Sequence, residues 1–130
     1  MKNLPVPTPL TAPYWEGCRA GELRIQHCPA CDRHQFYPRS LCAECLGDVD
    51  WVVASGAGEV ISYTIVRLPV AEAYAAEVPY VVALIRLHEG PQLMSQVDCQ
   101  LAEIETGRSV QVYFEAWSDE VTVPKFRLVP

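Results

Sequence analysis

The stretch Cys28-Pro29-Ala30-Cys31, separated by ten residues from Cys42-Ala43-Glu44-Cys45, decides how the first third of this chain folds. Two residues between cysteines allow a tight turn that directs both sulfur atoms to one point, and a second such turn completes a tetrahedron. Four thiolates favour zinc, with iron as the usual competitor. Two disulfides, unrelated thiols or a redox-active dithiol are the alternatives, and they are less typical of paired Cys-x-x-Cys motifs where no secretion signal is recognised. The sequence therefore predicts a structural zinc ion with the ligands Cys28, Cys31, Cys42 and Cys45.

The histidines do not add a catalytic centre to these cysteines. His27 and His34 flank the four thiols, and His88 falls in a predicted turn. A catalytic zinc keeps one coordination position open, whereas four cysteines fill the site, so we expect both flanking histidines to be solvated neighbours of the metal. The sequence also contains no nucleophile elbow, phosphate-binding loop or dinucleotide-binding fingerprint. We therefore predict no catalytic residues.

Composition and charge limit the class of protein. The chain has 130 residues, of which 50% are hydrophobic, so it can form one domain or a small module attached to a modest core. Residues 1–45 contain few aliphatic runs, and metal binding must supply part of their folding free energy. These residues carry five basic and four acidic groups, whereas the remainder carries five basic and twelve acidic groups. An acidic body of this kind disfavours a nucleic-acid partner.

Localisation follows from what the sequence does not contain. The N-terminus has no apolar signal region, and no uninterrupted apolar stretch is long enough to span a bilayer. We expect a cytoplasmic protein without a membrane partner. Cys18 and Cys99 lie outside the paired motifs, and we interpret them as small buried hydrophobic residues.

The N-terminal segment, residues 1–22, is predicted to be an arm followed by a short helix. Residues 1–10 contain three prolines and read as an extended arm, and a helix is expected from Thr11, with Thr11 as its cap. Pro13 then falls in the first turn and Gly21 just past the end. The few apolar residues of this helix could pack on the chain itself or on a partner subunit, and both alternatives stay open.

A zinc ribbon is predicted over residues 23–47. Leu23 to Gln26 and Gln35 to Pro38 are its expected strands, one on each side of the first cysteine pair. Phe36, Tyr37 and Arg39 then project from a ribbon too small to bury them. They could pack on the second module or contact another molecule.

A small antiparallel β-barrel is predicted over residues 48–130. The strand candidates are 49–55, 59–68, 80–88, 92–97, 109–116 and 121–128, with a loop or one helical turn over 70–78. Pro124 predicts an edge position or a bulge in the last strand. The long early strand favours an OB-fold, with an SH3-like barrel or a short sandwich as alternatives. The fold class is thus mainly β: a short N-terminal helix, a rubredoxin-like zinc ribbon and a C-terminal OB-fold barrel.

From about residue 11 onward the chain closely resembles a known family. The resemblance rests on an ordered series of motifs: Pro13-Tyr14-Trp15, Leu23, Gln26-His27-Cys28, Cys31, Phe36-Tyr37-Pro38-Arg39, Cys42-Ala43-Glu44-Cys45, Ser55-Gly56-Ala57-Gly58, Ser62-Tyr63-Thr64, Val78-Pro79-Tyr80 and Pro124-Lys125-Phe126. In this order they are similar to the zinc-ribbon plus OB-fold acyl-CoA-associated proteins, the domain of unknown function thirty-five family. The family commonly has glycine after the second cysteine, where this chain has Asp32.

The resemblance implies an auxiliary subunit that is not an enzyme on its own. Family members dock on thiolase-superfamily enzymes such as thiolases, acyltransferases and aldolases, so we expect a hetero-oligomer that processes acyl-CoA thioesters. The four cysteines match the metal ligands of the family. From their chemistry we expect partner contacts at Trp15, Phe36, Tyr37 and Arg39.

Two other functions stay open on the sequence alone. OB-folds and zinc ribbons also bind single-stranded nucleic acid, although the acidic barrel and the scarcity of lysine weigh against it. The isolated chain could instead bind acyl-CoA directly, with Arg33 and Arg39 meeting the CoA phosphates.

Overall fold

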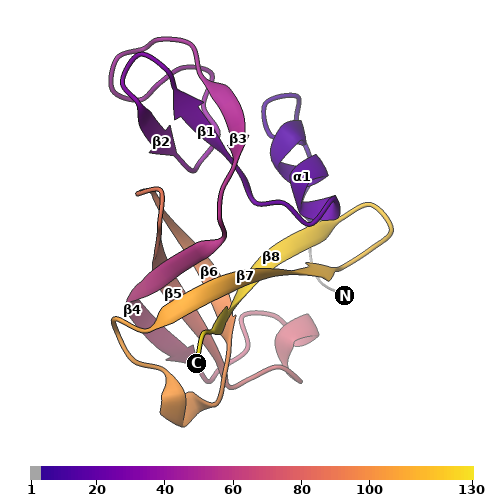
Figure 1. Cartoon of the computed structure of the whole chain (residues 1–130). Coiled ribbons are helices and arrows are strands. Elements are labelled where there is room, and N and C mark those ends of the chain that lie inside the picture. Colours follow the sequence, from indigo (N-terminus) through magenta and orange to yellow (C-terminus); the bar gives the residue numbers. More distant parts are fainter. Residues whose placement is uncertain (1–3) are drawn as a thin grey trace.

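The computed structural model describes residues 4–130 and has two connected parts. A three-stranded sheet at the N-terminal end projects from a closed β-barrel, and a short helix lies beside the sheet, against one side of the barrel (Figure 1). No helix in these described residues is long and apolar enough to cross a membrane. The mainly β fold class predicted from the sequence, with its zinc ribbon and OB-fold, is confirmed.

The barrel is closed by β4 (Ala57–Val66), β5 (Tyr80–Leu87), β6 (Gln92–Asp98), β7 (Ser109–Ala116) and β8 (Thr122–Leu128), in the order β4-β5-β6-β8-β7. Buried and less buried residues alternate along β5, because successive side chains of a strand point to opposite faces. The inward-facing hydrophobic residues of the five strands include Val60, Val81, Ala83, Ile85, Leu87, Leu93, Val97, Val110 and Phe126. These side chains form most of the core.

The barrel closes through a very short contact between β6 and β8. Their parallel pairing covers two residue pairs, Val97 with Phe126 and Asp98 with Arg127. The N-terminal part of β8 forms backbone pairs with β7 alone. Pro124 lies in this part, which is the edge-like position that its missing N–H predicts. Here β6 contacts β8 through a side chain, because the hydroxyl of Ser95 donates to the carbonyl of Pro124 at 3.2 Å.

The ribbon sheet contains β1 (Arg24–Cys28), β2 (Arg33–Gln35) and β3 (Asp50–Val53), in the order β2-β1-β3. We expected the strand at 49–55 to belong to the barrel, and that expectation is wrong because β3 pairs along β1. A two-stranded hairpin is marginally stable in water, and β3 completes the ribbon sheet. The strand expected over Gln35 to Pro38 is also wrong, because β2 ends at Gln35.

Helix α1 (Ala12–Arg19) packs on the chain itself, which is one of the two alternatives left open above. Its buried residues are Tyr14, Gly17 and Cys18, and the helix contacts β1, β7 and β8. Thr11 precedes the helix but does not cap it as expected, because its hydroxyl accepts a hydrogen bond from the backbone N–H of Thr8 at 2.9 Å.

The remaining segments are short. Residues 4–8 form neither helix nor strand, and residues 1–3 of the expected arm lie outside the described residues. Two 3-10 helices, η1 (Glu72–Tyr74) and η2 (Leu101–Glu103), lie in the connections that follow β4 and β6. The first of them is the helical turn expected over 70–78. Cys18 is fully buried, as expected, whereas Cys99 is half-buried.

Gly56 fixes the point where the ribbon leaves the barrel. It is buried, with φ +81°, and a Cβ added to it would overlap Cγ1 of Val112. Its carbonyl accepts a hydrogen bond from the N–H of Val112 at 2.9 Å. The preceding N–H, of Ser55, donates to a carboxylate oxygen of Glu89 at 2.7 Å. The ribbon connection is therefore held on the barrel by backbone contacts that only glycine permits.

We predict that Gly56→Ala lowers the free energy of unfolding by about 2–4 kcal/mol, because left-handed strain adds to overpacking. Gly107 is the matched control, since its φ is +87° but nothing lies within 4 Å of the position of its added Cβ. Gly107→Ala should cost about 1–2 kcal/mol, from strain alone. Denaturant unfolding measures both variants, and equal losses would contradict the close contact with Val112.

Candidate metal centre and adjoining groove

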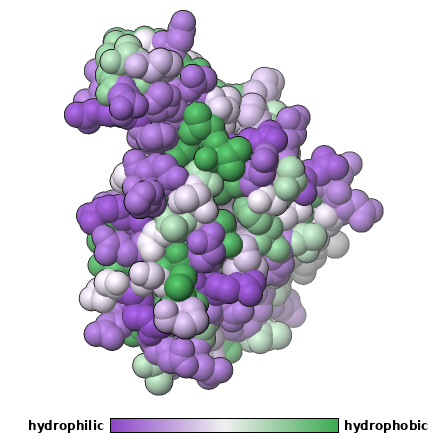
Figure 2. All heavy atoms as spheres, viewed as in Figure 1, coloured by the Kyte–Doolittle hydropathy of each residue, from purple (hydrophilic) through white to green (hydrophobic). Residues whose placement is uncertain are grey.

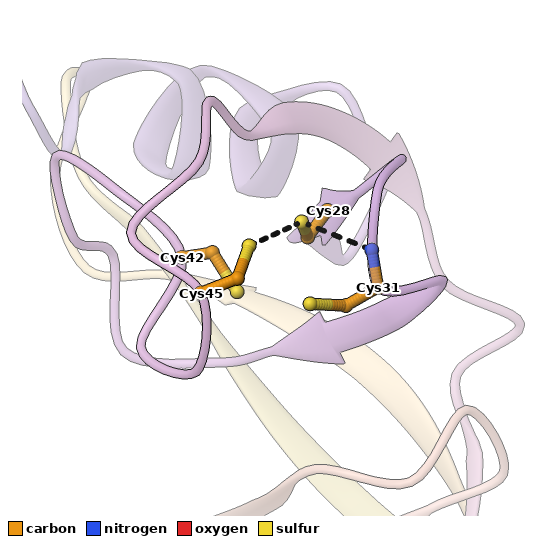
Figure 3. A group of neighbouring side chains, drawn as sticks. All are labelled: Cys28, Cys31, Cys42 and Cys45. Atoms are coloured by element: carbon orange, nitrogen blue, oxygen red, sulfur yellow. Dashed lines mark hydrogen bonds between the residues drawn. The ribbon is translucent and has the colours of Figure 1, made fainter.

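The four predicted metal ligands converge at one end of the ribbon. Their Sγ atoms all lie within 4.8 Å of one another, and the sulfur atoms of Cys28 and Cys45 are 3.6 Å apart. Figure 3 shows the four side chains pointing toward a common centre. Zinc–sulfur bonds of about 2.3 Å in a tetrahedron place sulfur atoms about 3.8 Å apart. The donor set therefore fits zinc, and the cysteines form no disulfide.

Backbone hydrogen bonds reach three of the four cysteine sulfur atoms, those of Cys28, Cys42 and Cys45. Backbone N–H groups of Cys31, Glu44 and Gly47 each donate to a cysteine sulfur at 3.4 Å. Hydrogen bonds from the backbone of Cys45 and Glu44 lower the pKa of Cys42 to about 7. The hydrogen bond to Cys45, together with burial, raises the pKa of Cys31 to about 12. The Cys42 thiol therefore loses its proton readily. Four thiolates can lie this close together only when a divalent cation offsets their negative charge.

His27 is engaged away from the cysteines. Its Nε2 lies 3.0 Å from a carboxylate oxygen of Asp32, and its Nδ1 lies 3.4 Å from one of Asp50. The hydrogen bond with Asp32 raises the pKa of His27, with a smaller contribution from Asp50. The ring of His34 lies beside it, with 4.8 Å between ring centroids. Both nitrogens of His27 therefore face carboxylates, which leaves the metal site to the four thiols.

Two glutamine side chains connect the ribbon sheet to the loop that carries Phe36 and Tyr37. Gln26 is 1% exposed, and its amide pairs with the backbone of Arg39: Nε2 donates to the carbonyl and Oε1 accepts from the N–H, both at 2.9 Å. Gln35 Nε2 donates to the same Oε1 at 2.6 Å, and Gln35 Oε1 accepts from the N–H of Ala43 at 3.0 Å. The loop and the second cysteine pair are thereby tied to β1 and β2.

A groove of about 320 Å³ opens where α1, this loop, β6 and β8 meet. It lies over the stretch in which β6 and β8 form no backbone pairs. Its lining residues are all uncharged: Thr11, Tyr14, Trp15, Phe36, Tyr37, Pro38, Leu93, Met94, Ser95, Val123 and Pro124. The groove is thus an apolar surface built from four segments that lie apart in the sequence.

Aromatic packing gives the groove its shape. Tyr14 contacts Trp15 and Phe36 edge-on, with ring centroids 4.9 and 5.7 Å apart, and Phe36 contacts Tyr37 at 4.9 Å. Burial raises the pKa of the Tyr14 phenol, so this ring stays neutral. Tyr37 and Met94 are 60% and 66% exposed at the rim. Hydrophobic side chains also gather where the ribbon joins the rest of the molecule, on a face that is otherwise largely hydrophilic (Figure 2).

The structure brings together only some of the residues proposed from the sequence. Trp15, Phe36 and Tyr37 line the groove, whereas Arg33 and Arg39 do not. Arg39 is exposed on the loop beyond Pro38, and the guanidinium of Arg33 lies 3.7 Å from the carboxylate of Glu44. Sequence reasoning missed the groove residues from the helix start and the barrel: Thr11, Tyr14, Leu93, Met94, Ser95, Val123 and Pro124. The proline in β8 was the available signal, since it marks the stretch that lacks a second partner strand.

Comparison with known proteins identifies both parts of the chain. Residues 15–52 match the family model described as the rubredoxin-like zinc ribbon domain of ChsH2, and residues 51–115 match the C-terminal OB-fold domain of ChsH2. A solved structure titled Ltp2-ChsH2(DUF35) aldolase is similar with a TM-score of 0.84 and 34% identity, over 95% of this chain and 98% of that one.

Two curated relatives differ in length. The chain is 37% identical over 117 residues to a probable enoyl-CoA hydratase alpha subunit of Thermomonospora curvata, which covers 88% of this chain but 36% of that protein. It is 35% identical over 96 residues to a DUF35 domain-containing scaffold protein of Methanothermobacter thermautotrophicus, over 72% of this chain and 71% of that protein. The chain therefore spans about a third of the hydratase subunit and most of the scaffold protein.

We predict that Gln26→Leu loosens the aromatic loop without removing the metal ligands. The substitution leaves the N–H and carbonyl of Arg39 without the Gln26 amide that bonds to both, which should cost about 1–3 kcal/mol of folding free energy. Zinc content should stay at one ion per chain, because the four cysteines are unchanged. Thermal unfolding and metal analysis measure the two effects, with Gln100→Leu at an exposed position as the control. Loss of zinc, or unchanged stability, would contradict this role of Gln26.

Proposed function

The chain belongs to the ChsH2 family of zinc-ribbon and OB-fold proteins, the DUF35 family, and from this premise we propose that it is a non-catalytic subunit of an acyl-CoA-processing complex. In this proposal the chain docks on a thiolase-superfamily enzyme, such as a thiolase, acyltransferase or aldolase. The larger subunit carries out the chemistry on the thioester, and this chain supports and positions it.

The apolar groove is the observation that carries the proposal. Its rim exposes Tyr37 and Met94 next to an apolar lining, and a contiguous exposed apolar surface is typical of an interaction site. Aromatic residues and methionine are enriched at protein interfaces, and hot spots centre on pockets that exclude water. The groove therefore suits an apolar anchor from another subunit, with Trp15, Phe36 and Tyr37 as the principal contacts and Arg39 at the edge.

The metal centre supports a structural role. Four thiolates fill a tetrahedral zinc site and leave no position for water or substrate. When bound, zinc supplies folding free energy to a ribbon whose hydrophobic core is small. The cysteines thereby hold β1, β2 and the aromatic loop in one arrangement. The metal thus maintains the docking surface.

The relatives support the acyl-CoA assignment and the role of a subunit. One is described as a scaffold protein, one as a hydratase alpha subunit, and the similar structure as an aldolase that includes a ChsH2 component. For this chain, the thiolase-superfamily partner and the thioester are our proposal. Arg33 and Arg39 are exposed basic residues near the docking surface, and we assign them to the CoA phosphates.

Single-stranded nucleic acid is the less favoured ligand. Lys125, one of two lysines in the sequence, is 7% exposed, and its ammonium group lies 2.6 Å from the carboxylate of Glu115. It is therefore not available to a phosphate backbone. Tight, salt-sensitive binding in an oligonucleotide shift assay would reverse this ranking.

We predict that Tyr37→Ala weakens binding to the thiolase-superfamily subunit at least tenfold while leaving the chain folded, because Tyr37 is 60% exposed. Isothermal titration calorimetry with a purified thiolase-superfamily subunit from the same organism measures the change. Tyr63→Ala is the matched control, since Tyr63 is 40% exposed on β4 and lies outside the groove. Equal affinity of both variants would contradict docking at the groove.

We also predict that Cys28→Ser releases zinc and dissociates the complex before it affects the barrel. The serine hydroxyl is a poor zinc ligand, so the ribbon loses its metal-dependent stability. Metal analysis, size-exclusion chromatography with the enzyme subunit, and circular dichroism of the β-barrel report the three effects. Normal complex formation by the zinc-free variant would show that the ribbon is not a docking element.

A further inference from the structure

Asp32 and Leu46 occupy equivalent positions in the two Cys-x-x-Cys turns, each directly after the second cysteine. Both have a left-handed backbone, with φ of 54° for Asp32 and 63° for Leu46. The turn around a metal-binding cysteine pair requires this conformation, but an L-residue adopts it with strain, because its Cβ approaches the following carbonyl oxygen. Glycine avoids the strain, and a bulky residue at such a position is an outlier.

The two residues differ in what compensates the strain. Aspartate tolerates the left-handed region, and the carboxylate of Asp32 pairs with Nε2 of His27 at 3.0 Å. Leu46 has neither advantage: its side chain is 72% exposed and lies outside the hydrophobic core that the described residues form. The chain therefore keeps an apolar side chain in water at a position where glycine would be less strained.

We propose that Leu46, with Leu41 beside the same cysteine pair, is a contact surface for the enzyme subunit, an inference that rests on the proposed function. The turn requires the left-handed conformation but not a leucine, and a strained residue kept where glycine would serve is typical of functional sites. In the complex, an apolar depression on the enzyme subunit covers the leucine side chain. The gain from burial then offsets both the strain and the exposure seen in the free chain.

Continuity with the groove favours the same occupant for both surfaces. The segment from Tyr37, which lines the groove, leads to Leu41, which is 42% exposed. Gln35 Nε2 donates to the carbonyl of Leu41 at 3.3 Å, and the N–H of Leu46 donates to the carbonyl of Cys42 at 3.0 Å. The loop and the second cysteine turn are thus held in fixed relation to one another. One partner that fills the groove can therefore extend along the ribbon to Leu46.

The test compares stability and binding in Leu46→Gly. Relief of strain should raise the Tm by about 2–5 °C in the zinc-loaded chain, whereas affinity for the thiolase-superfamily subunit should fall at least fivefold. If Leu46 had a purely structural role, its replacement would not raise the Tm and lower the affinity at the same time. Asp32→Gly is the matched control for glycine in a cysteine turn, and Leu68→Ser, at an 83% exposed leucine after β4, is the control for loss of exposed apolar surface. Both controls should bind as the unaltered chain does.

The outcomes separate this inference from the proposed function. Unchanged binding by Leu46→Gly, with binding still weakened by Tyr37→Ala, would overturn the inference and leave the groove as the docking site. A lower Tm would overturn the strain on which the inference rests. Loss of self-association in analytical ultracentrifugation, without loss of enzyme binding, would show that a second copy covers Leu46. If the unaltered chain forms no complex with the enzyme subunit, the proposed function itself fails and the inference falls with it.

Discussion

The short parallel pairing between β6 and β8 is the constraint on which the rest of the structure depends. Two residue pairs join these strands, next to Phe126 in the core, and beyond them the hydroxyl of Ser95 donates to the carbonyl of Pro124 at 3.2 Å. Helix α1 packs against β8 and β7, and residues of α1 and of the aromatic loop line a groove over this stretch together with residues of β6 and β8. The way in which β6 meets β8 therefore determines where this apolar surface forms.

The ribbon is held by two kinds of interaction that do not depend on a large core. The first is the convergence of the four cysteine sulfur atoms on one point. The second is the hydrogen bonding of the Gln26 and Gln35 side chains, which holds the loop after β2 where no strand pairing does so. Metal ligation stabilises the two cysteine turns, whereas the buried amides fix the aromatic residues between them. At Gly56 the backbone contacts the barrel directly, so the ribbon and the groove keep one relative arrangement.

Sequence patterns predicted much of the fold because their causes are local. Cysteine spacing, proline and glycine positions and alternating hydrophobic residues predicted the metal-binding ribbon, the short helix and the strands of the barrel. The assignment of β3 to the barrel was wrong, because a strand pattern does not reveal which neighbour a strand pairs with. The roles of Gln26 and Met94 were also missed. The burial of Gln26 follows from the loop that bonds to its amide, and the exposure of Met94 follows from its place at the groove rim; neither contact is local in the sequence.

The central claim is that the groove and the adjoining ribbon bind an enzyme subunit. Hydrogen–deuterium exchange of this chain, with and without the thiolase-superfamily subunit, tests it most directly. Complex formation should slow exchange in α1, in residues 36–46 and in the N-terminal half of β6, and leave the connection from β4 to β5 unchanged. Protection confined to that connection, or no protection in any of the three segments, would contradict docking at the groove.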